Sequence, residues 1–305
     1  MRYESGYILT RTFTFKRLSK MVKLNPVQGE KGGMTMNTLK IRELYLQPGR
    51  PKIAIPVVST DPAEIKNECV EITEMPCDMI EWRADKYLSA VPDLEEKLKQ
   101  KEFYLDSVKL LDDINLIAED IPIIFTIRSR SQGGDVQLSE EHMAGLRGLA
   151  AQSGLVDMVD IELLDGNGRF NAEMIKKQVD EVHSYGCKVI MSHHDFDRMP
   201  TPEQMVSIVK TMVRMGADVC KLAAMSFTKE DTELLLKTTA YLNRNIDVPI
   251  VMIAMGEAGR PARVAAGKYG SCITFAAGLD KSAPGQVDAY AMKKMLDDYY
   301  GREEK

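Results

Sequence analysis

The chain has 305 residues, of which 44% are hydrophobic, and its 40 basic and 45 acidic side chains give a net charge of −5. This length suits one large domain or two ordinary ones, with enough apolar residues for a sizeable core. The near balance of charge gives no electrostatic basis for binding nucleic acid or an anionic membrane surface. No stretch approaches the roughly 18 consecutive apolar residues that a membrane-spanning helix requires.

Residues 1–37 differ in composition from the rest of the chain. From Met1 to Lys23 basic residues dominate and Glu4 is the one acid, but the apolar centre of a secretory signal is missing. An acid-poor start with arginine and threonine also occurs in transit peptides. We favour a disordered N-terminal extension over residues 1–37, followed by one folded domain over residues 38–305.

From Pro51 onward, short apolar runs alternate with amphipathic stretches. Eight runs are typical of buried strands: residues 51–58, 77–82, 122–127, 156–163, 187–191, 217–222, 249–253 and 272–276. Helices are expected near residues 61–75, 92–118, 139–153, 171–185, 202–215, 228–245, 259–268 and 285–299. Prolines at first helical positions and glycines just after helices support several of these boundaries.

Eight strand–helix units predict an α/β protein, folded as a single (β/α)8 TIM barrel. The runs are apolar on both faces, as parallel strands covered by helices require. An open doubly wound sheet is the alternative fold. Such a sheet usually has a glycine-rich turn after its first strand, whereas residues 56–60 contain no glycine.

Two neighbouring strands end in residues suited to imine chemistry. The run 187–191 leads into His193-His194-Asp195-Phe196, and the run 217–222 contains Lys221. A strand, a helix and a strand form a right-handed parallel unit, so both ends lie at the same edge of the sheet. A base beside a desolvated lysine amine can form an imine with a carbonyl substrate. A strand lysine can also be an edge residue whose amine reaches water.

Other predicted strands also end in charged groups. Glu81 and Arg83 point to one side of their strand, Arg128 follows the next strand, and Asp160 and Glu162 lie on the one after. A pair such as Glu81 and Arg83 can also fill one end of a barrel for purely structural reasons. The excess of charge at one edge indicates a site for an anionic substrate.

Cysteine and histidine usage argues against a metal site. The five cysteines form no CxxC pair, and none of the four histidines has metal-ligand spacing to a cysteine pair. Buried free thiols in a reducing compartment are expected instead.

Taken together, the strand-end motifs resemble type I 3-dehydroquinate dehydratase (3-dehydroquinase). This is the Schiff-base dehydratase of the shikimate pathway, which leads to chorismate and the aromatic amino acids. The resemblance covers about residues 50–300 and rests on motifs in one order: Glu81-Trp82-Arg83, Phe125-Thr126-Ile127-Arg128, Gly133-Gly134, Ser153-Gly154-Leu155-Val156-Asp157, Ser192-His193-His194-Asp195-Phe196, Cys220-Lys221-Leu222-Ala223 and Ser282-Ala283-Pro284-Gly285-Gln286.

The resemblance implies a role for each matching residue. Lys221 corresponds to the lysine that forms an imine with the C3 carbonyl of 3-dehydroquinate. His194 corresponds to the general acid/base that takes the C2 proton and helps water leave from C1. The remaining residues would hold the substrate: Arg263 on its carboxylate, Glu81, Arg83 and Arg128 around the ring hydroxyls, Ser282 and Gln286 from the loop after the last strand, and Met255 and Phe275 as an apolar wall. The family implies no metal or organic cofactor, a cytoplasmic location and a homodimer.

Gln132 departs from the pattern of the family, which usually has a glutamate there as the partner of the catalytic histidine. A neutral amide orients the imidazole but stabilises its cation less well. We therefore expect a lower pKa for His194 than in relatives with the glutamate. His193, where many relatives have asparagine, and Pro56, in place of a small hydroxyl residue, are further departures.

Two other functions stay open. A class I aldolase-type lyase would use the same fold and lysine, but it expects a glycine-rich phosphate site, and the loop 255–259 contains Glu257. A non-catalytic ligand-sensing homologue would have no use for both Lys221 and His194. We expect a hydro-lyase that acts on 3-dehydroquinate.

Overall fold

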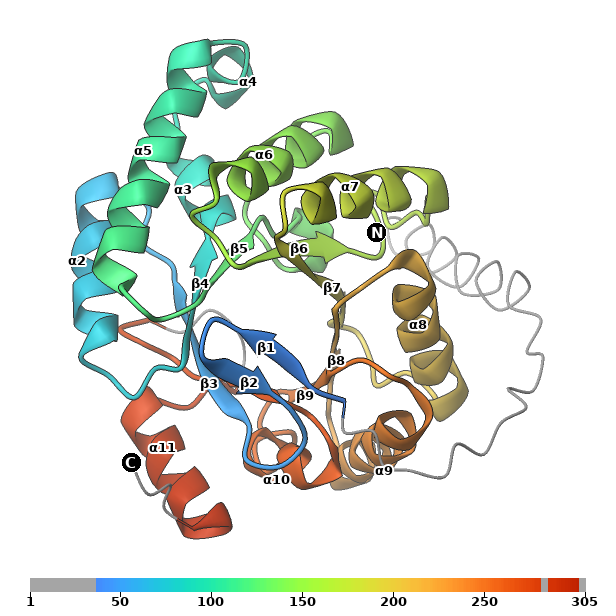
Figure 1. Ribbon diagram of the computed structural model, residues 1–305. Coiled ribbons are helices and arrows are strands. Elements are labelled where there is room, and N and C mark those ends of the chain that lie inside the picture. Colours follow the sequence, from blue (N-terminus) through green and yellow to red (C-terminus); the bar gives the residue numbers. More distant parts are fainter. Residues whose placement is uncertain (1–36, 281–284, 302–305) are drawn as a thin grey trace, which may run out of the picture.

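The computed structural model describes residues 37–280 and 285–301. Eight parallel strands form one sheet in the order β10-β3-β4-β5-β6-β7-β8-β9, and the helices surround it (Figure 1). The strands are β3 (Lys52–Val57), β4 (Met79–Arg83), β5 (Ile123–Thr126), β6 (Met158–Glu162), β7 (Lys188–Asp195), β8 (Val219–Met225), β9 (Ile250–Met255) and β10 (Ile273–Phe275).

The first and last strands of this order meet and close the ring. Ile250 and Ser271 form a parallel bridge between β9 and the approach to β10. The Cys272 N–H donates to the Ile250 carbonyl at 2.8 Å. The predicted (β/α)8 barrel is therefore confirmed.

The helices agree with the sequence prediction except around residues 84–118. One helix was expected over 92–118. The structure instead has α3 (Ala84–Ala90) before this range and two helices within it, α4 (Leu94–Lys97) and α5 (Lys101–Ala118). Pro92 ends α3 because proline restricts the residue before it, and Val91 is extended. The helices are α2 (Pro62–Thr73), α3 (Ala84–Ala90), α4 (Leu94–Lys97), α5 (Lys101–Ala118), α6 (Glu140–Ser153), α7 (Ala172–Ser184), α8 (Pro202–Met215), α9 (Lys229–Asn245), α10 (Ala262–Tyr269) and α11 (Ala289–Tyr300).

Helix α8 illustrates how local sequence specifies these elements. Thr201 caps its N-terminus in a capping box with Gln204, and Pro202 occupies the first turn. Its buried apolar residues recur at helical spacing: Met205, Ile208, Val209 and Met212. They pack into the main core, which fills the layer between the strands and the surrounding helices.

A short antiparallel hairpin, β1 (Leu39–Ile41) and β2 (Leu44–Leu46), was not predicted. Its buried residues Ile41 and Leu46 belong to a second core inside the barrel, together with Met79 and Met158. The hairpin lies across the ring (Figure 1) and covers its amino-terminal end. Strands of three residues carry too little pattern to be recognised in a sequence.

Most of the expected N-terminal extension, residues 1–36, lies outside the described residues. Asn37 is buried, and its amide donates to the Asn243 carbonyl at 3.0 Å. The described part of the chain begins at this residue.

A side-chain clamp repeats around the amino-terminal edge of the barrel. In every second pair of neighbouring strands, a side chain just before the second strand accepts a hydrogen bond from a backbone N–H of the first strand. This links strands in pairs and helps to set their register. The pairs are Ile53 to Asp78 at 2.7 Å, Ile123 to Asp157 at 2.8 Å, Val189 to Asp218 at 2.8 Å and Met252 to Ser271 at 3.0 Å.

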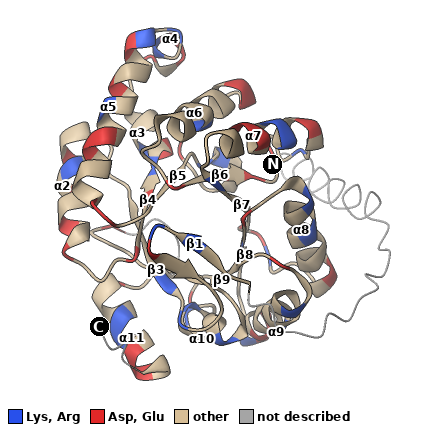
Figure 2. Cartoon of the chain, viewed as in Figure 1, with Lys and Arg blue, Asp and Glu red and all other residues tan. Residues whose placement is uncertain are grey.

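The outer surface carries both signs of charge. Figure 2 shows acidic and basic segments interspersed over the helices, as the overall balance of charge predicts. Among the residues described, none of the helices is both long and apolar enough to cross a membrane.

Candidate active site

A pocket of about 520 Å3 opens at the carboxyl ends of the barrel strands. It brings together every predicted site residue except Ser282, which lies outside the described residues. The pocket is lined by Glu81, Arg83, Arg128, Gln132, Gly133, His194, Phe196, Lys221, Ala223, Ile253, Met255, Arg263, Phe275 and Gln286.

Lys221 lies on β8 with its amine inside the barrel and only 5% of the residue exposed. Its Nζ is 3.3 Å from Glu81 Oε1, 4.0 Å from Asp160 Oδ2 and 4.1 Å from the centre of the Phe275 ring. Burial lowers the pKa of Lys221 below its usual range, although Glu81 and Asp160 act in the opposite direction. A lowered pKa increases the neutral, nucleophilic fraction of the amine.

His194 is held from one side by Gln132, which lies in a 3-10 turn, Arg130–Gln132. Gln132 Oε1 accepts from the His194 backbone N–H at 2.9 Å and lies 3.2 Å from His194 Nδ1. The Gln132 amide donates to the Leu164 carbonyl at 3.2 Å, which identifies its oxygen as the atom facing His194. Nδ1 must therefore carry the hydrogen, so the lone pair of the neutral ring is on Nε2.

Burial is the main cause that lowers the pKa of His194 well below its usual value. The nearby cations Arg128 and Lys221 act in the same direction. The imidazole is consequently neutral at physiological pH and able to accept a proton.

Two glycines and a phenylalanine shape the wall beside His194. The Phe196 ring stacks on the His194 ring with centres 6.3 Å apart and an interplanar angle of 16°. A Cβ on Gly133, which has φ +86°, would lie 2.5 Å from Phe196 Cζ. A Cβ on Gly134 would lie 1.8 Å from the Arg128 carbonyl oxygen. Both positions thus need glycine to bring Gln132 and Phe196 against His194.

The floor of the pocket is a buried ionic network around Arg128. Its guanidinium donates to Asp160 at 2.7 Å, to Glu162 at 2.9 Å and to Ser192 at 2.7 Å. Ser192 in turn donates to Asp160 at 2.6 Å. Burial raises the pKa of Asp160, but Arg128 and Lys221 outweigh it and the net pKa is low. Asp160 is therefore an anion close to the lysine amine.

Arg83 and Arg263 lie on other walls of the pocket. Asp85 holds Arg83 with two contacts of 2.7 Å and also accepts from the Arg128 backbone N–H at 3.2 Å. Arg263, from α10, donates to the Phe275 carbonyl at 3.1 Å. Burial, and then Arg260, lower the pKa of Arg263 to about 10. Since burial disfavours its charge, an anionic group in the pocket would stabilise it.

Comparison with known proteins decides which family uses this arrangement. A model of the family "Type I 3-dehydroquinase" matches residues 53–303. The chain belongs to the Type I 3-dehydroquinase family.

Curated relatives named 3-dehydroquinate dehydratase match this chain over nearly their whole length. The protein from Listeria welshimeri is 33% identical over 263 residues, which is 86% of this chain and 98% of the relative. The protein from Clostridium kluyveri is 36% identical over 259 residues, which is 85% of this chain and 96% of the relative. The activity of the family is that of a hydro-lyase acting through a lysine Schiff base in the shikimate pathway.

Solved structures of type I 3-dehydroquinases share the fold. The 3-dehydroquinate dehydratase of Geobacillus kaustophilus superposes with a TM-score of 0.77 at 30% identity, over 87% of this chain and 98% of that one. The type I 3-dehydroquinate dehydratase of Clostridium difficile, solved with covalently modified comenic acid, has the same TM-score, identity and coverage.

The sequence did not assign several residues that the structure places in or beside the site. Asp160 was noted as a strand-end acid without a role, and Phe196 was noted only within a motif. Asp85 and Ser192 act as partners of arginines. A signal was available for Asp160 and Ser192, because each lies on the inward side of its strand, two residues from Glu162 or His194.

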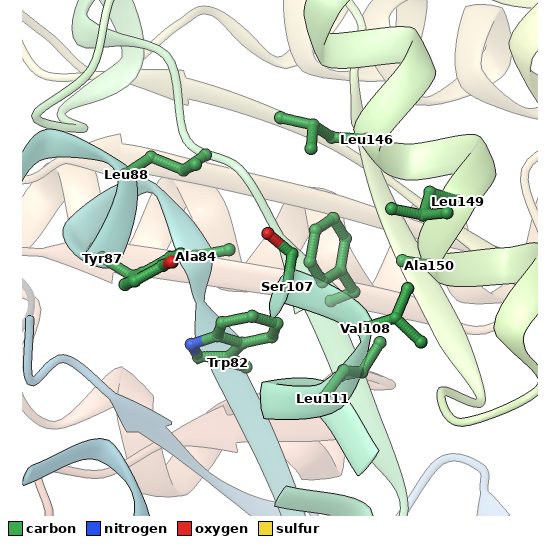
Figure 3. A pocket seen from close by; sticks show the side chains of 11 residues that line it. Trp82, Ala84, Tyr87, Leu88, Ser107, Val108, Leu111, Leu146, Leu149 and Ala150 are labelled. Atoms are coloured by element: carbon green, nitrogen blue, oxygen red, sulfur yellow. The ribbon is translucent and has the colours of Figure 1, made fainter. Parts of the chain in front are cut away.

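A second hollow lies outside the barrel and is not part of this site. It measures about 360 Å3 and is bounded by β4, β5, α3, α5 and α6. Figure 3 shows Trp82 at its base with Tyr87, Leu88 and Leu146 around it. Its lining is almost entirely apolar, so it belongs to the packing between the strands and the helices of the barrel.

Proposed function

We propose that this chain converts 3-dehydroquinate to 3-dehydroshikimate in the pocket described above, with Lys221 as the imine-forming residue and His194 as the general acid/base. One observation carries the proposal. The buried amine of Lys221 and the imidazole of His194 line the same pocket, and Gln132 Oε1 accepts the hydrogen bond from Nδ1 of that imidazole.

Lys221 begins the reaction by attacking the C3 carbonyl of the substrate. Its lowered pKa supplies the neutral amine that this step needs. Loss of water from the adduct leaves a cationic imine. Glu81 and Asp160, at 3.3 and 4.0 Å from Nζ, are placed to stabilise that cation. The imine withdraws electrons from C2, so no metal or organic cofactor is needed as an electron sink.

His194 then transfers the protons. Its Nε2 lone pair takes a proton from C2, while Gln132 Oε1 keeps Nδ1–H in place. The electron pair of the C2–H bond moves toward the imine and then expels the C1 hydroxyl, which takes the proton from His194 and leaves as water. Hydrolysis of the conjugated imine releases the enone product and regenerates the Lys221 amine.

The remaining lining residues position the substrate. Arg263 binds the carboxylate, because a guanidinium matches its two oxygens. The polar groups Glu81, Arg83 and Arg128 contact the ring hydroxyls. We assign Ser282 and Gln286, from the loop after β10, to the substrate hydroxyls, and Met255 and Phe275 to an apolar wall. This wall keeps water from the imine until the product forms.

We also propose that the enzyme is a cytoplasmic homodimer, as the family implies. All five cysteines are free thiols, and four of them are buried. Burial raises the pKa of Cys69 to about 12, which keeps this thiol unreactive. These features suit a reducing compartment. Light scattering on the full chain tests the dimer, and a monomer mass across the working concentration range would rule it out.

A trapping experiment tests the central proposal. The protein is incubated with 3-dehydroquinate, reduced with borohydride and weighed by intact mass spectrometry, and the modified peptide is then mapped. An adduct on Lys221 that is absent from Lys221→Met is expected. Binding without an adduct would instead favour the ligand-sensing alternative, and an adduct without release of the dehydrated product would favour another imine-forming lyase.

A further inference from the structure

Helix α5 carries a row of exposed residues along its outer face. The helix packs between α2 and α6 on the outside of the barrel (Figure 1). Leu105 is 59% exposed, and Leu116, at 68%, has the largest exposed fraction among the large hydrophobic residues described. Four exposed charged residues accompany the two leucines: Lys101, Lys109, Asp112 and, just past the end of the helix, Asp120. We call these six residues the α5 stripe. With 3.6 residues per turn, its five helical positions fall within an arc of about 80°.

The α5 stripe reads the same in both directions, except that the sign of the charge is inverted. Its members form three pairs, each centred on the peptide bond between Leu110 and Leu111. Basic residues precede this centre at the distances at which acidic residues follow it. The pairs are Leu105 with Leu116, Lys109 with Asp112 and Lys101 with Asp120.

This order makes the stripe complementary to itself. When two copies of α5 pack antiparallel about a two-fold axis through the centre, each leucine lies level with a leucine of the other copy. Each lysine then lies level with an aspartate of the other copy. A parallel pair would instead place like charges at the same level. The pattern therefore favours an antiparallel pair of identical helices.

The charged residues of the α5 stripe are not used within the chain. Across residues 37–280 and 285–301, none of the four takes part in an ion pair or a side-chain hydrogen bond. Outer helix α7 differs, because Lys176 pairs with Asp180 of the same helix at 2.8 Å. On α5, Asp113 pairs with Lys66 of α2 at 3.3 Å, but Asp113 is outside the stripe. The charges of the stripe are thus available to another molecule.

We propose that the α5 stripe is the contact surface of a homodimer in which α5 of two copies packs antiparallel about a two-fold axis. The partner is a second copy because such an axis requires the same surface on both copies, with complementary residues at matched positions. The leucines supply the apolar centre of the contact and the charged residues its polar surround. This inference rests on the homodimer proposed above and names its surface.

Residues beside α5 enlarge the surface. A stable dimer buries about 800 Å2 on each copy, which is more than one helical stripe provides. Val70 on α2 is 50% exposed and lies one turn beyond Lys66, on the same side of that helix. Since α2 and α5 both run back toward the start of the next strand, Val70 lies toward the Leu116 end of α5. We assign Val70 to the edge of the same surface.

Charge reversal tests the surface by light scattering on the full chain. Lys109→Glu leaves only acidic charges at the centre of the stripe, and Asp112→Lys leaves only basic ones. We expect each variant alone to have a dimer Kd at least about a hundredfold higher than wild type, because like charges then face each other. An equimolar mixture of the two should form heterodimers, since the acidic centre of one variant faces the basic centre of the other. The combined variant Lys109→Glu/Asp112→Lys should dimerise like wild type.

Matched variants control for the change of charge itself. Lys176→Glu reverses an exposed lysine of another outer helix and should leave the dimer Kd within about twofold of wild type. Asp112→Ala removes a charge without opposing one and should have little effect, because exposed ion pairs contribute little. Among the described residues that line the active-site pocket, none comes from α5. The kcat of the charge variants should therefore stay within about twofold of wild type, which shows that they fold.

Cysteine cross-linking tests the antiparallel direction. Leu105 and Leu116 lie about 16 Å apart along α5, too far for a short bis-maleimide to join equivalent positions of two antiparallel copies. Coexpressed Leu105→Cys and Leu116→Cys chains should give a cross-linked dimer that contains one of each, and either variant alone should give none. Cross-links within one variant, or none in the mixture, overturn the antiparallel contact. The wild type, with four of its five thiols buried, is the blank.

The outcomes separate this surface from the other proposals. A dimeric wild type whose charge variants also remain dimers overturns the α5 surface alone. A monomeric wild type overturns the homodimer and this surface with it. Charge variants that are monomers and stay so when mixed also overturn the surface, because the loss then does not follow charge. Borohydride trapping on Lys221 still tests the catalytic proposal in each case.

Discussion

Gln132 binds His194 twice through one oxygen: Oε1 accepts from the backbone N–H at 2.9 Å and lies 3.2 Å from ring Nδ1. The same side chain is anchored by its amide to the Leu164 carbonyl. The amide can therefore only accept from His194, which sets the tautomer without adding a negative charge. Burial already lowers the pKa of His194, and an uncharged partner does not raise it again. The imidazole therefore stays neutral, and able to act as a base, at lower pH.

Replacing Gln132 by glutamate should raise the pKa of His194, because a carboxylate stabilises the imidazolium. We expect the acidic limb of the kcat/KM profile to move to higher pH by about one unit. Gln132→Met serves as the control that removes the acceptor at similar size. It should lower kcat by about 10–100-fold, as losses of orienting partners do. Coincident acidic limbs in wild type and Gln132→Glu would contradict this account.

Lys221→Met should separate activity from stability. Without the amine no imine forms, so we expect turnover to fall by at least about a thousandfold. The lowered pKa of Lys221 shows that the folded protein disfavours its cation. A neutral side chain of similar volume removes that penalty, so the thermal midpoint at pH 7 should not fall. Relative to this variant, the wild type should become more stable as the pH rises toward the unfolded pKa of lysine, about 10.4. A midpoint that drops sharply at every pH would refute this reading of Lys221.

Gly134→Ala should lower activity by displacing the loop that carries Gln132. The added Cβ would meet the Arg128 carbonyl at 1.8 Å, so the backbone must move, and Gln132 and Arg128 must move with it. We expect a loss of activity of about 100-fold, since small displacements of catalytic groups have effects of that size. Gly145→Ala on α6 is the matched control. Nothing lies within 4 Å of its added Cβ, and it should be neutral or stabilise the protein by about 0.5–1 kcal/mol.

Asp78→Ala should weaken the barrel without changing the chemistry. It leaves the Ile53 N–H without the acceptor now at 2.7 Å, at the end of the barrel opposite the site. We expect a loss of about 1–3 kcal/mol in the free energy of unfolding and a kcat within about twofold of wild type. Asp112→Ala, at an exposed position of α5, is the control and should change neither quantity. A large fall in kcat for Asp78→Ala would show that this clamp also shapes the pocket.

The sequence predicted most of the framework because barrel strands and helices carry strong local patterns. Strands β3 to β10 lie within the apolar runs identified from the sequence, apart from extensions at the ends of β4, β7, β8 and β9. The errors arose where local pattern was weak. Strands β1 and β2 are three residues each. The break between α3 and α4 contains Asp93, whose left-handed φ of +51° no periodicity reveals.

By itself, the sequence determined which residues stand at the carboxyl ends of the strands, because strand order and side-chain alternation are local properties of the chain. That was enough to place Lys221, His194 and Arg128 in one pocket. Only the tertiary structure decided which of them touch. Lys221 and Glu81 are separated by 140 residues along the chain yet lie 3.3 Å apart. Such a distance depends on ring closure and on the register between strands, and so do the burial and charge that set each pKa.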